Sequence, residues 1–241
     1  GVGAVATKTY VDDVFSTYLW KGNGSTSTVN NGIDLSGEGG LTWIKQRQQG
    51  GNDQHFLYDT IRGATERVLA NNSSAEGTTS TGLTQFNNNG FNLGSTHNES
   101  SGDETYASWT FRKSPMFDIV EWSGNGANRL INHNLGSVPG MVAVKCTSHS
   151  QNWQIWHKDF GYTHSFSFNR EEMPDTGASS TWNSTNPTAT QISVGPSVVN
   201  ASGRDYIAYV FAGGESTAAT ARSVAFDASG DYLNTTTSSS D

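Results

Sequence analysis

The sequence repeats itself with a period of roughly 100 residues, and this duplication limits the chain to two copies of one fold. Phe15–Gly24 aligns without gaps on Phe117–Gly126, and the two segments share Phe, Trp and a Gly-Asn-Gly turn. The structural anchors of the repeat are therefore Phe15, Trp20, Phe117 and Trp122. We therefore expect two modules with the same fold, one after the other along the chain.

Further matches follow in the same order along both copies. They pair Gly40–Lys45 with Gly140–Lys145, His55–Gly63 with Trp153–Gly161, Thr84–Phe86 with Thr190–Ile192, and Tyr106–Phe111 with Tyr206–Phe211. Two modules follow, over residues 15–113 and 117–213. Ser114-Pro115 between them is expected to be a hinge, because proline cannot donate to a ladder and restricts the residue before it.

The strands of each copy show a period of two residues. Tyr106, Ser108 and Thr110 fall on one face of a strand, and the residues between them fall on the other. Turn signals recur at intervals of about 8 to 12 residues, which favours an antiparallel sandwich. We predict an all-β chain made of two tandem antiparallel β-sandwich modules, preceded by a short N-terminal helix.

The expected helix covers residues 7–18. Val11, Val14, Phe15 and Tyr18 recur at the spacing of one helix face. So short a helix needs a partner surface, which is either its own sandwich or the same helix of sister chains. We predict the second arrangement, with residues 1–14 as a lead and oligomerisation segment and a homo-oligomer, most simply a trimer, as the assembly.

Composition excludes several classes of protein. The formal charge is −8 and Lys and Arg do not cluster, so no nucleic-acid partner is expected. No stretch approaches the roughly 20 apolar residues that span a bilayer, so no membrane insertion is expected. The single Cys146 cannot form an internal disulfide, and its alternating context predicts strand packing.

No pattern in the sequence predicts an enzyme, a cofactor or a metal site. A G-x-S-x-G elbow is missing, and the His residues lack ligand spacing. The acidic pairs Asp118 and Glu121, and Glu171 and Glu172, are interpreted as solvated charges. The triplet Asp227, Ser229 and Asp231 lacks the downstream glutamate of a calcium loop, and Gly1–Ala6 lacks the preceding strand of a dinucleotide site.

The tryptophans divide into core residues and one ligand-contacting candidate. Trp20 and Trp122 recur at equivalent positions, so both are expected to be buried. Trp182 lies in a polar Ser-Ser-Thr-Trp-Asn-Ser-Thr loop and is expected to be exposed, where its ring can stack on a sugar.

Three segments carry a family resemblance. Ala6–Asp13 resembles the ATK-x-YVD segment that introduces oligomerising helices in phage tail-fibre proteins. Residues from about 5 to 213 resemble an uncharacterised domain of marine bacteriophage structural proteins. Ser223–Leu233 is similar to the opening strand of concanavalin A-like, laminin-G-like modules, so residues 214–241 are expected to be a linker and the start of a further module.

The resemblance implies a non-enzymatic structural component of a phage fibre or virion appendage that contributes to host-surface attachment. It implies an extracellular, virion location, with sister chains, other virion proteins and host surface glycans as partners. The alternative is a carbohydrate-binding module or adhesin of a bacterial extracellular protein, which has the same sandwich and aromatic loops.

Overall fold

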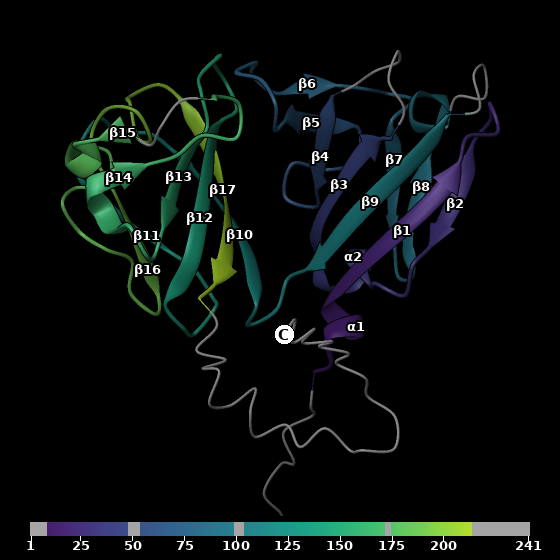
Figure 1. Cartoon of the computed structure of the whole chain (residues 1–241), viewed down its shortest axis with the longest axis horizontal. Helices are drawn as coiled ribbons and strands as arrows, with labels where there is room; N and C mark the ends of the chain where they lie inside the picture. The colour runs from purple at the N-terminus through teal and green to yellow at the C-terminus, as the bar shows by residue number, and fades with distance from the viewer. Residues whose placement is uncertain (1–8, 48–53, 99–103, 172–174, 214–241) are drawn as a thin grey trace, which may run out of the picture.

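The computed structural model describes residues 9–47, 54–98, 104–171 and 175–213, and these form an all-β chain (Figure 1). Its two α-helices, α1 (Val11–Val14) and α2 (Leu35–Glu38), are single turns. Short 3₁₀ turns occur at η1 (Ser95–His97), η2 (Gly161–Thr163) and η3 (Ala178–Ser180). None of the helices in these residues has the length and hydropathy needed to cross a membrane.

The first module packs a six-stranded antiparallel sheet against a three-stranded one. In sheet order, the larger sheet contains β1 (Phe15–Lys21), β9 (Thr105–Arg112), β3 (Gly40–Gln46), β4 (His55–Asp59), β5 (Glu66–Leu69) and β6 (Gly77–Thr78). The smaller sheet contains β2 (Ser27–Asn30), β8 (Gly90–Leu93) and β7 (Leu83–Asn87). The core between them includes Val29, Ile44, Phe56, Phe91 and Tyr106.

The second module repeats this arrangement with fewer strands. Its main sheet contains β10 (Phe117–Ser123), β17 (Asp205–Ala212), β12 (Pro139–Cys146) and β13 (Gln154–His157). Two-stranded sheets are formed by β11 (Arg129–Asn132) with β16 (Gln191–Val194), and by β14 (His164–Ser165) with β15 (Asp175–Thr176). The core of this module includes Trp122, Ile131, Val144, Trp156 and Ile192, and it buries Cys146 as expected.

The strand registers confirm the duplication. In the first module the β1–β9 ladder begins at Phe15↔Phe111, and in the second the β10–β17 ladder begins at Phe117↔Phe211. The last strand of each module then also pairs with a strand from the middle of its copy. Leu41 of β3 lies opposite Phe111 of β9, and Met141 of β12 lies opposite Phe211 of β17. The prediction of two tandem antiparallel sandwiches is therefore confirmed.

One of the proposed sequence matches is wrong. Val29 lies opposite Phe91 on β8, and its equivalent Ile131 lies opposite Ile192 on β16. Strand β16 is therefore the counterpart of β8, and its match to Thr84–Phe86 on β7 does not hold. The mistake arose because short polar runs recur by chance in a sequence rich in Asn, Ser and Thr. Among the described residues, β7 has no counterpart in the second module.

The two modules share a third apolar core. The main sheets face each other (Figure 1), and apolar side chains of both modules pack between them. The buried residues of this core are Leu41, Leu57, Val68, Ala70, Phe117, Ile119, Ala143, Trp153, Ile155, Ile207 and Tyr209. Phe111 of the first module contacts its own equivalent, Phe211, with ring centroids 5.4 Å apart. Each main sheet is thus covered on both faces.

Ser114-Pro115 does not form the expected hinge. The backbone N–H of Ser114 donates to the carbonyl of Phe117 at 2.9 Å, and the N–H of Phe117 donates back at 3.1 Å. These two hydrogen bonds close a tight turn at the edge of the shared core. Proline has the expected place in a connection, but the packing on both sides holds that connection in one geometry.

The N-terminal helix is shorter than predicted. Helix α1 ends at Val14, and β1 begins at Phe15, so Phe15 and Tyr18 are strand residues. In β1 the half-buried Tyr18 and Trp20 alternate with exposed Thr17, Leu19 and Lys21, which is the period of a strand. Pairing with β9 outweighs the weak tendency of so short a segment to stay helical. The helical stripe behind the predicted trimer does not form in these residues, and residues 1–8 lie outside those described.

Candidate functional site

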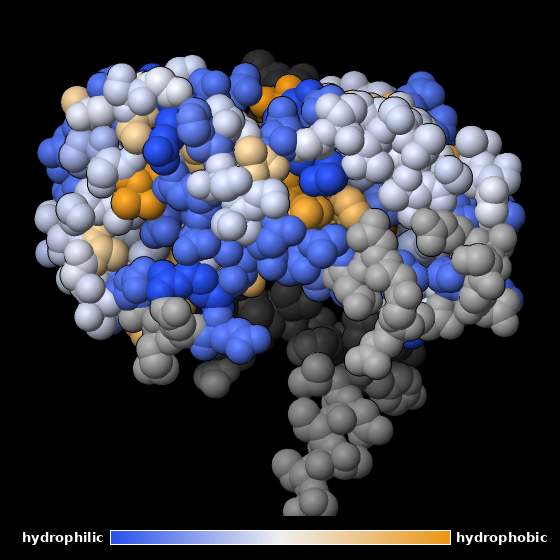
Figure 2. All heavy atoms as spheres, turned by 90° about the horizontal axis from the view of Figure 1, so that it is seen from above, coloured by the Kyte–Doolittle hydropathy of each residue, from blue (hydrophilic) through white to orange (hydrophobic). Residues whose placement is uncertain are grey.

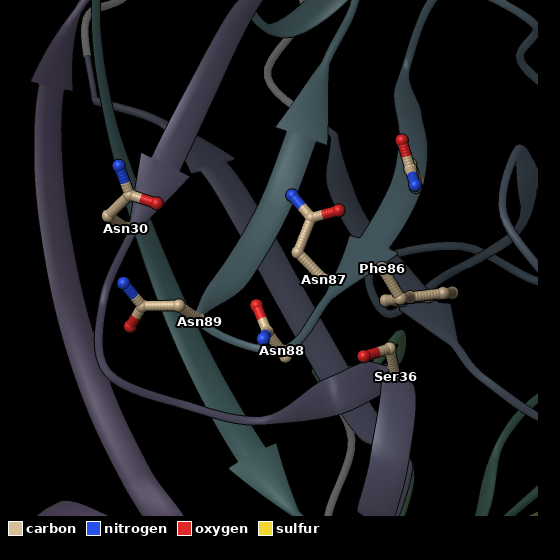
Figure 3. A pocket seen from close by; sticks show the side chains of 7 residues that line it. Asn30, Ser36, Phe86, Asn87, Asn88 and Asn89 are labelled. Atoms are coloured by element: carbon tan, nitrogen blue, oxygen red, sulfur yellow. The ribbon is translucent and has the colours of Figure 1, made fainter.

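An open pocket of about 390 Å³ lies at the turn of the β7–β8 hairpin in the first module (Figure 3). Its walls come from three parts of the chain: the end of β2, the first turn of α2, and the hairpin. The lining residues are Asn30, Ser36, Gln85, Phe86, Asn87, Asn88 and Asn89. We call this the asparagine pocket.

The hairpin turn is fixed by local chemistry. Asn87 pairs with Gly90, so Asn88 and Asn89 form a two-residue loop. Gly90 has φ +127°, and a Cβ at this position would collide with the carbonyl oxygen of Val29. Asn89 ties the loop to the segment after β2, because its Oδ1 accepts from the N–H of Gly32 at 3.0 Å. The loop is therefore held against the strand that supplies Asn30.

Hydrogen bonds between amide side chains on the outer face of the smaller sheet orient two pocket residues, Gln85 and Asn87. The Nδ2 of Asn87 donates to the Oδ1 of Asn92 at 2.9 Å, and the Nδ2 of Asn92 donates to the Oε1 of Gln85 at 3.0 Å. Thr28 also donates to Asn92, at 2.9 Å. Gln85 and Asn87 are therefore each held at one end of the amide, and the other end stays available for a ligand.

The chemistry of the asparagine pocket is neutral. Five of its seven lining side chains are amides, one is a hydroxyl and one is the half-buried ring of Phe86. No lining side chain is ionisable, so the pocket supplies neither a general acid or base nor a charge for an anion or a cation. It supplies hydrogen-bond donors and acceptors in close array.

A second pocket, of about 290 Å³, lies on the second module and is apolar. It is lined by Met141, Ile155, His157, Phe160, Phe166, Ser167 and Phe168. The Phe160 ring is exposed and packs edge-on against Phe166 at 4.8 Å between centroids. Seen from above, the surface of the molecule is mostly hydrophilic and carries several separate hydrophobic patches (Figure 2).

Buried charges meet at the interface between the modules. Asp59 of the first module accepts from the N–H of Ile61 at 3.0 Å and from the Nε of Arg62 at 2.6 Å. It also accepts from the phenol of Tyr209, in the second module, at 2.8 Å. Burial raises the pKa of Tyr209 well above its ordinary value, so this phenol remains a hydrogen-bond donor. Asp59, Arg62 and Tyr209 thus hydrogen-bond to one another, and the Tyr209–Asp59 bond joins the two modules.

Trp182 does not lie where the sequence suggested. Only 2% of the residue is exposed, and its indole Nε1 donates to the carbonyl of His164 at 3.2 Å. The polar loop turns through η3 and directs this one large apolar side chain into the core of the second module. The prediction of an exposed, ligand-contacting Trp182 is wrong, because the ring faces inward while Ser180, Ser184 and Thr185 of the same polar loop are exposed.

The four repeat anchors lie at equivalent places in the two copies. Trp122 is buried and Trp20 is half-buried, and each ring stacks on a tyrosine of the last strand of its module, at 5.6 Å from Tyr206 and 5.4 Å from Tyr106. The expected burial is thus confirmed for Trp122 and is only partial for Trp20. Phe15 and Phe117 begin equivalent ladders, and both pack on Phe111.

Three of the four residues of the acidic pairs lie within the described ranges. Asp118 is buried rather than solvated: it pairs with the ammonium of Lys113 at 3.1 Å and accepts from the N–H of Asn134 at 2.8 Å. Glu121 on the same strand is exposed, as is Glu171. No group of three or more metal-ligating side chains occurs within the described ranges. Glu172 and the segment 227–231 lie outside these ranges, as does Gly1–Ala6.

The asparagine pocket was not predicted from the sequence. Its one local signal is the run Asn87-Asn88-Asn89-Gly90, which reads as a turn. Asn30 and Ser36 lie more than fifty residues from that run and join it only through the β2–β8 pairing and the packing of α2 on β7.

Comparison with known proteins places the chain in a family without assigning it an activity. No curated protein and no solved structure matches it. Residues 11–218 match a family described as a domain of unknown function, DUF7483. The matched region runs across both copies of the repeat, so the family unit is the double sandwich rather than the single module. This chain belongs to the DUF7483 family.

Proposed function

We propose that this chain is a non-enzymatic structural component of a bacteriophage fibre or a similar virion appendage. The observation that carries the proposal is the apolar core shared by the two main sheets, which joins two modules into one stiff body. A stiff element suits an appendage that holds its shape and transmits force between neighbouring modules.

Hydrogen bonds between the modules support this stiffness. The indole of Trp153 donates to the carbonyl of Leu69 at 2.8 Å, deep in the interface. Two backbone bonds also cross it: Glu76 donates to Thr147 at 2.8 Å, and Gln151 donates to Ser73 at 2.7 Å. Sliding one module over the other would break these bonds and expose the shared core, which opposes such motion.

The buried charged groups also favour a structural role. Asp59 has four hydrogen-bond donors on its two oxygens, and Arg62 also reaches Glu76 at 3.2 Å. A carboxylate so fully bonded has no oxygen left with which to take a proton from a substrate.

The proposed location is the virion, outside the cell. This part of the proposal draws on the resemblance of residues 5 to 213, and of the segment Ala6–Asp13, to phage structural and tail-fibre proteins. Sister chains and other virion proteins are the proposed partners. Self-association remains part of the proposal, although it cannot use the predicted helix beyond Val14.

Labelling of intact particles tests this function. Antibodies raised against the purified chain are applied to virions of the phage that encodes it, and electron microscopy locates the gold label. Label on a fibre or appendage supports the proposal. Virions that carry none of the protein by mass spectrometry contradict it, and glycan hydrolysis that a single carboxylate substitution abolishes contradicts its non-enzymatic part.

Carbohydrate recognition is the second candidate function. It is favoured by one observation, the neutral, amide-lined asparagine pocket on the surface of the first module. The two functions are compatible, since a rigid appendage can carry a contact site.

A further inference from the structure

We propose that the asparagine pocket binds a neutral carbohydrate. This inference rests on the second candidate function and gives it a site and a ligand class, and it does not depend on the structural role. Its ligand class is a polyhydroxylated, uncharged sugar unit, recognised by the amide side chains of the lining (Figure 3).

The lining matches the hydrogen-bonding character of a sugar. Each sugar hydroxyl both donates and accepts, and each primary amide offers two donors and one acceptor oxygen. With no ionisable side chain in the lining, the pocket has no means of neutralising a phosphate, a sulfate or a metal ion. Neutral hydroxyls are the groups that this set of side chains satisfies.

The polar atoms left for a ligand are of both kinds. Because Gln85 and Asn89 use their oxygens internally, their amide N–H groups stay available as donors. Because Asn87 uses its Nδ2, its Oδ1 stays available as an acceptor. These orientations are set before a ligand arrives, which reduces the entropy lost on binding.

Two further amides have no internal role. Within the part of the chain that the structure describes, the side chains of Asn30 and Asn88 make no hydrogen bond, and both are exposed. Asn30 ends β2 and Asn88 lies in the β7–β8 loop, and both line the same pocket. Turn chemistry accounts for an asparagine at position 88, but not for Asn30 on β2 or Gln85 on β7.

Comparison of the two copies shows which pocket residues the fold itself does not need. Asn132 is the equivalent of Asn30, and its Oδ1 accepts from Gln191 at 2.9 Å, so this amide is used within its own sheet. Within the described residues, the second sandwich forms a packed core without a strand like β7. In the first copy Leu83 of β7 belongs to the core, but the exposed amides Gln85, Asn88 and Asn89 do not. The core of the sandwich therefore does not need these amides.

Saturation-transfer NMR on the full chain tests the inference. The probes are methyl glycosides of glucose, galactose, mannose and N-acetylglucosamine, their disaccharides, and glucuronate as the charged comparator. We expect at least one neutral probe to bind with a Kd of about 1 mM, as suits an open site with few contacts, and glucuronate to gain nothing from its charge.

Asn30→Ala and Asn88→Ala, made separately, should each weaken that binding about tenfold, the loss expected for one or two hydrogen bonds. Neither change breaks an internal hydrogen bond of the described chain, so the variants should keep the thermal stability of the parent. Asn132→Ala in the second module is the matched control and should leave binding unchanged.

Two outcomes overturn the inference. The first is the absence of binding by every neutral probe at tens of millimolar. The second is binding that both pocket variants leave intact, and loss of that binding in Phe160→Ala would place the sugar on the aromatic pocket instead. Neither of these bears on the structural role, which the labelling of virions decides separately.

Discussion

Trp20 and Trp122 make the same hydrogen bond in the two copies of the module. The indole of Trp20 donates to the carbonyl of His97 at 2.9 Å, and the indole of Trp122 donates to the carbonyl of Val199 at 3.1 Å. In both cases the acceptor lies 77 residues further along the chain. Each bond fastens the first strand of a module to the loop before its last strand, so each closes the sandwich at one end.

Replacing these tryptophans by alanine should destabilise the chain by unequal amounts. Trp122 is 6% exposed, so Trp122→Ala should lower the free energy of unfolding by about 3 to 5 kcal/mol through lost burial and a cavity. Trp20 is only half-buried, so Trp20→Ala should cost about 1 to 3 kcal/mol. Urea unfolding followed by circular dichroism measures both. A larger loss for Trp20 than for Trp122 would contradict the difference in packing.

His97 should make the chain sensitive to acid. It is buried, with its Nε2 at 2.8 Å from the phenol oxygen of Tyr58, and burial, together with Arg67, lowers its pKa from 6.5 to about 3. Between these two values the unfolded chain takes up a proton that the folded chain does not. The free energy of unfolding should therefore fall as pH drops below about 6.5, by at most about 1.4 kcal/mol per pH unit from this group.

A double variant isolates the contribution of His97. Val199 occupies the equivalent position in the second copy, so His97→Val introduces a residue that the module already accepts, and Tyr58→Phe removes the phenol that would lose its partner. Urea unfolding between pH 7 and pH 4 should show a shallower loss of stability for the double variant than for the parent. Parallel pH profiles would mean that other groups cause the acid sensitivity.

The same residues explain which parts of the fold the sequence reveals. Tryptophan and the Gly-Asn-Gly turn are rare and restrictive, so their recurrence predicted equivalent ladders correctly. Gly24 and Gly126 both have a positive φ, of 74° and 71°, which few other residues adopt easily. Matches between Ser, Thr, Asn and Gln carried far less information, and the false pairing of β7 with β16 was one of them.

The sequence contains a signal of the shared core that our prediction did not take into account. Met141–Val144 and Tyr206–Phe211 are runs of apolar residues without alternation, and such runs indicate a strand that is covered on both faces. The asparagine pocket had no such signal, because the pairing of β2 with β8 decides whether Asn30 meets the hairpin. Trp182 was misjudged because the polarity of a loop does not reveal which way its one aromatic side chain points.

Phe15 should matter for stability rather than for assembly. Its ring packs on Phe111 with centroids 4.8 Å apart, and its backbone starts the β1–β9 ladder. Phe15→Asp should therefore lower the midpoint of thermal unfolding and leave the mass of the folded protein unchanged in light scattering. Leu19→Asp is the matched control on the same strand, because Leu19 is 62% exposed and should tolerate the charge. A stable Phe15→Asp variant that dissociates a parent oligomer would restore the N-terminal segment as the assembly contact.

The central claim is that the two modules behave as one body because they share a core and the Asp59–Tyr209 hydrogen bond. Differential scanning calorimetry of the full chain tests it most directly. The account predicts one unfolding transition whose calorimetric enthalpy matches its van't Hoff enthalpy, as for a single cooperative unit. Two separate transitions, or a calorimetric enthalpy about twice the van't Hoff value, would show that the modules unfold independently and would contradict it.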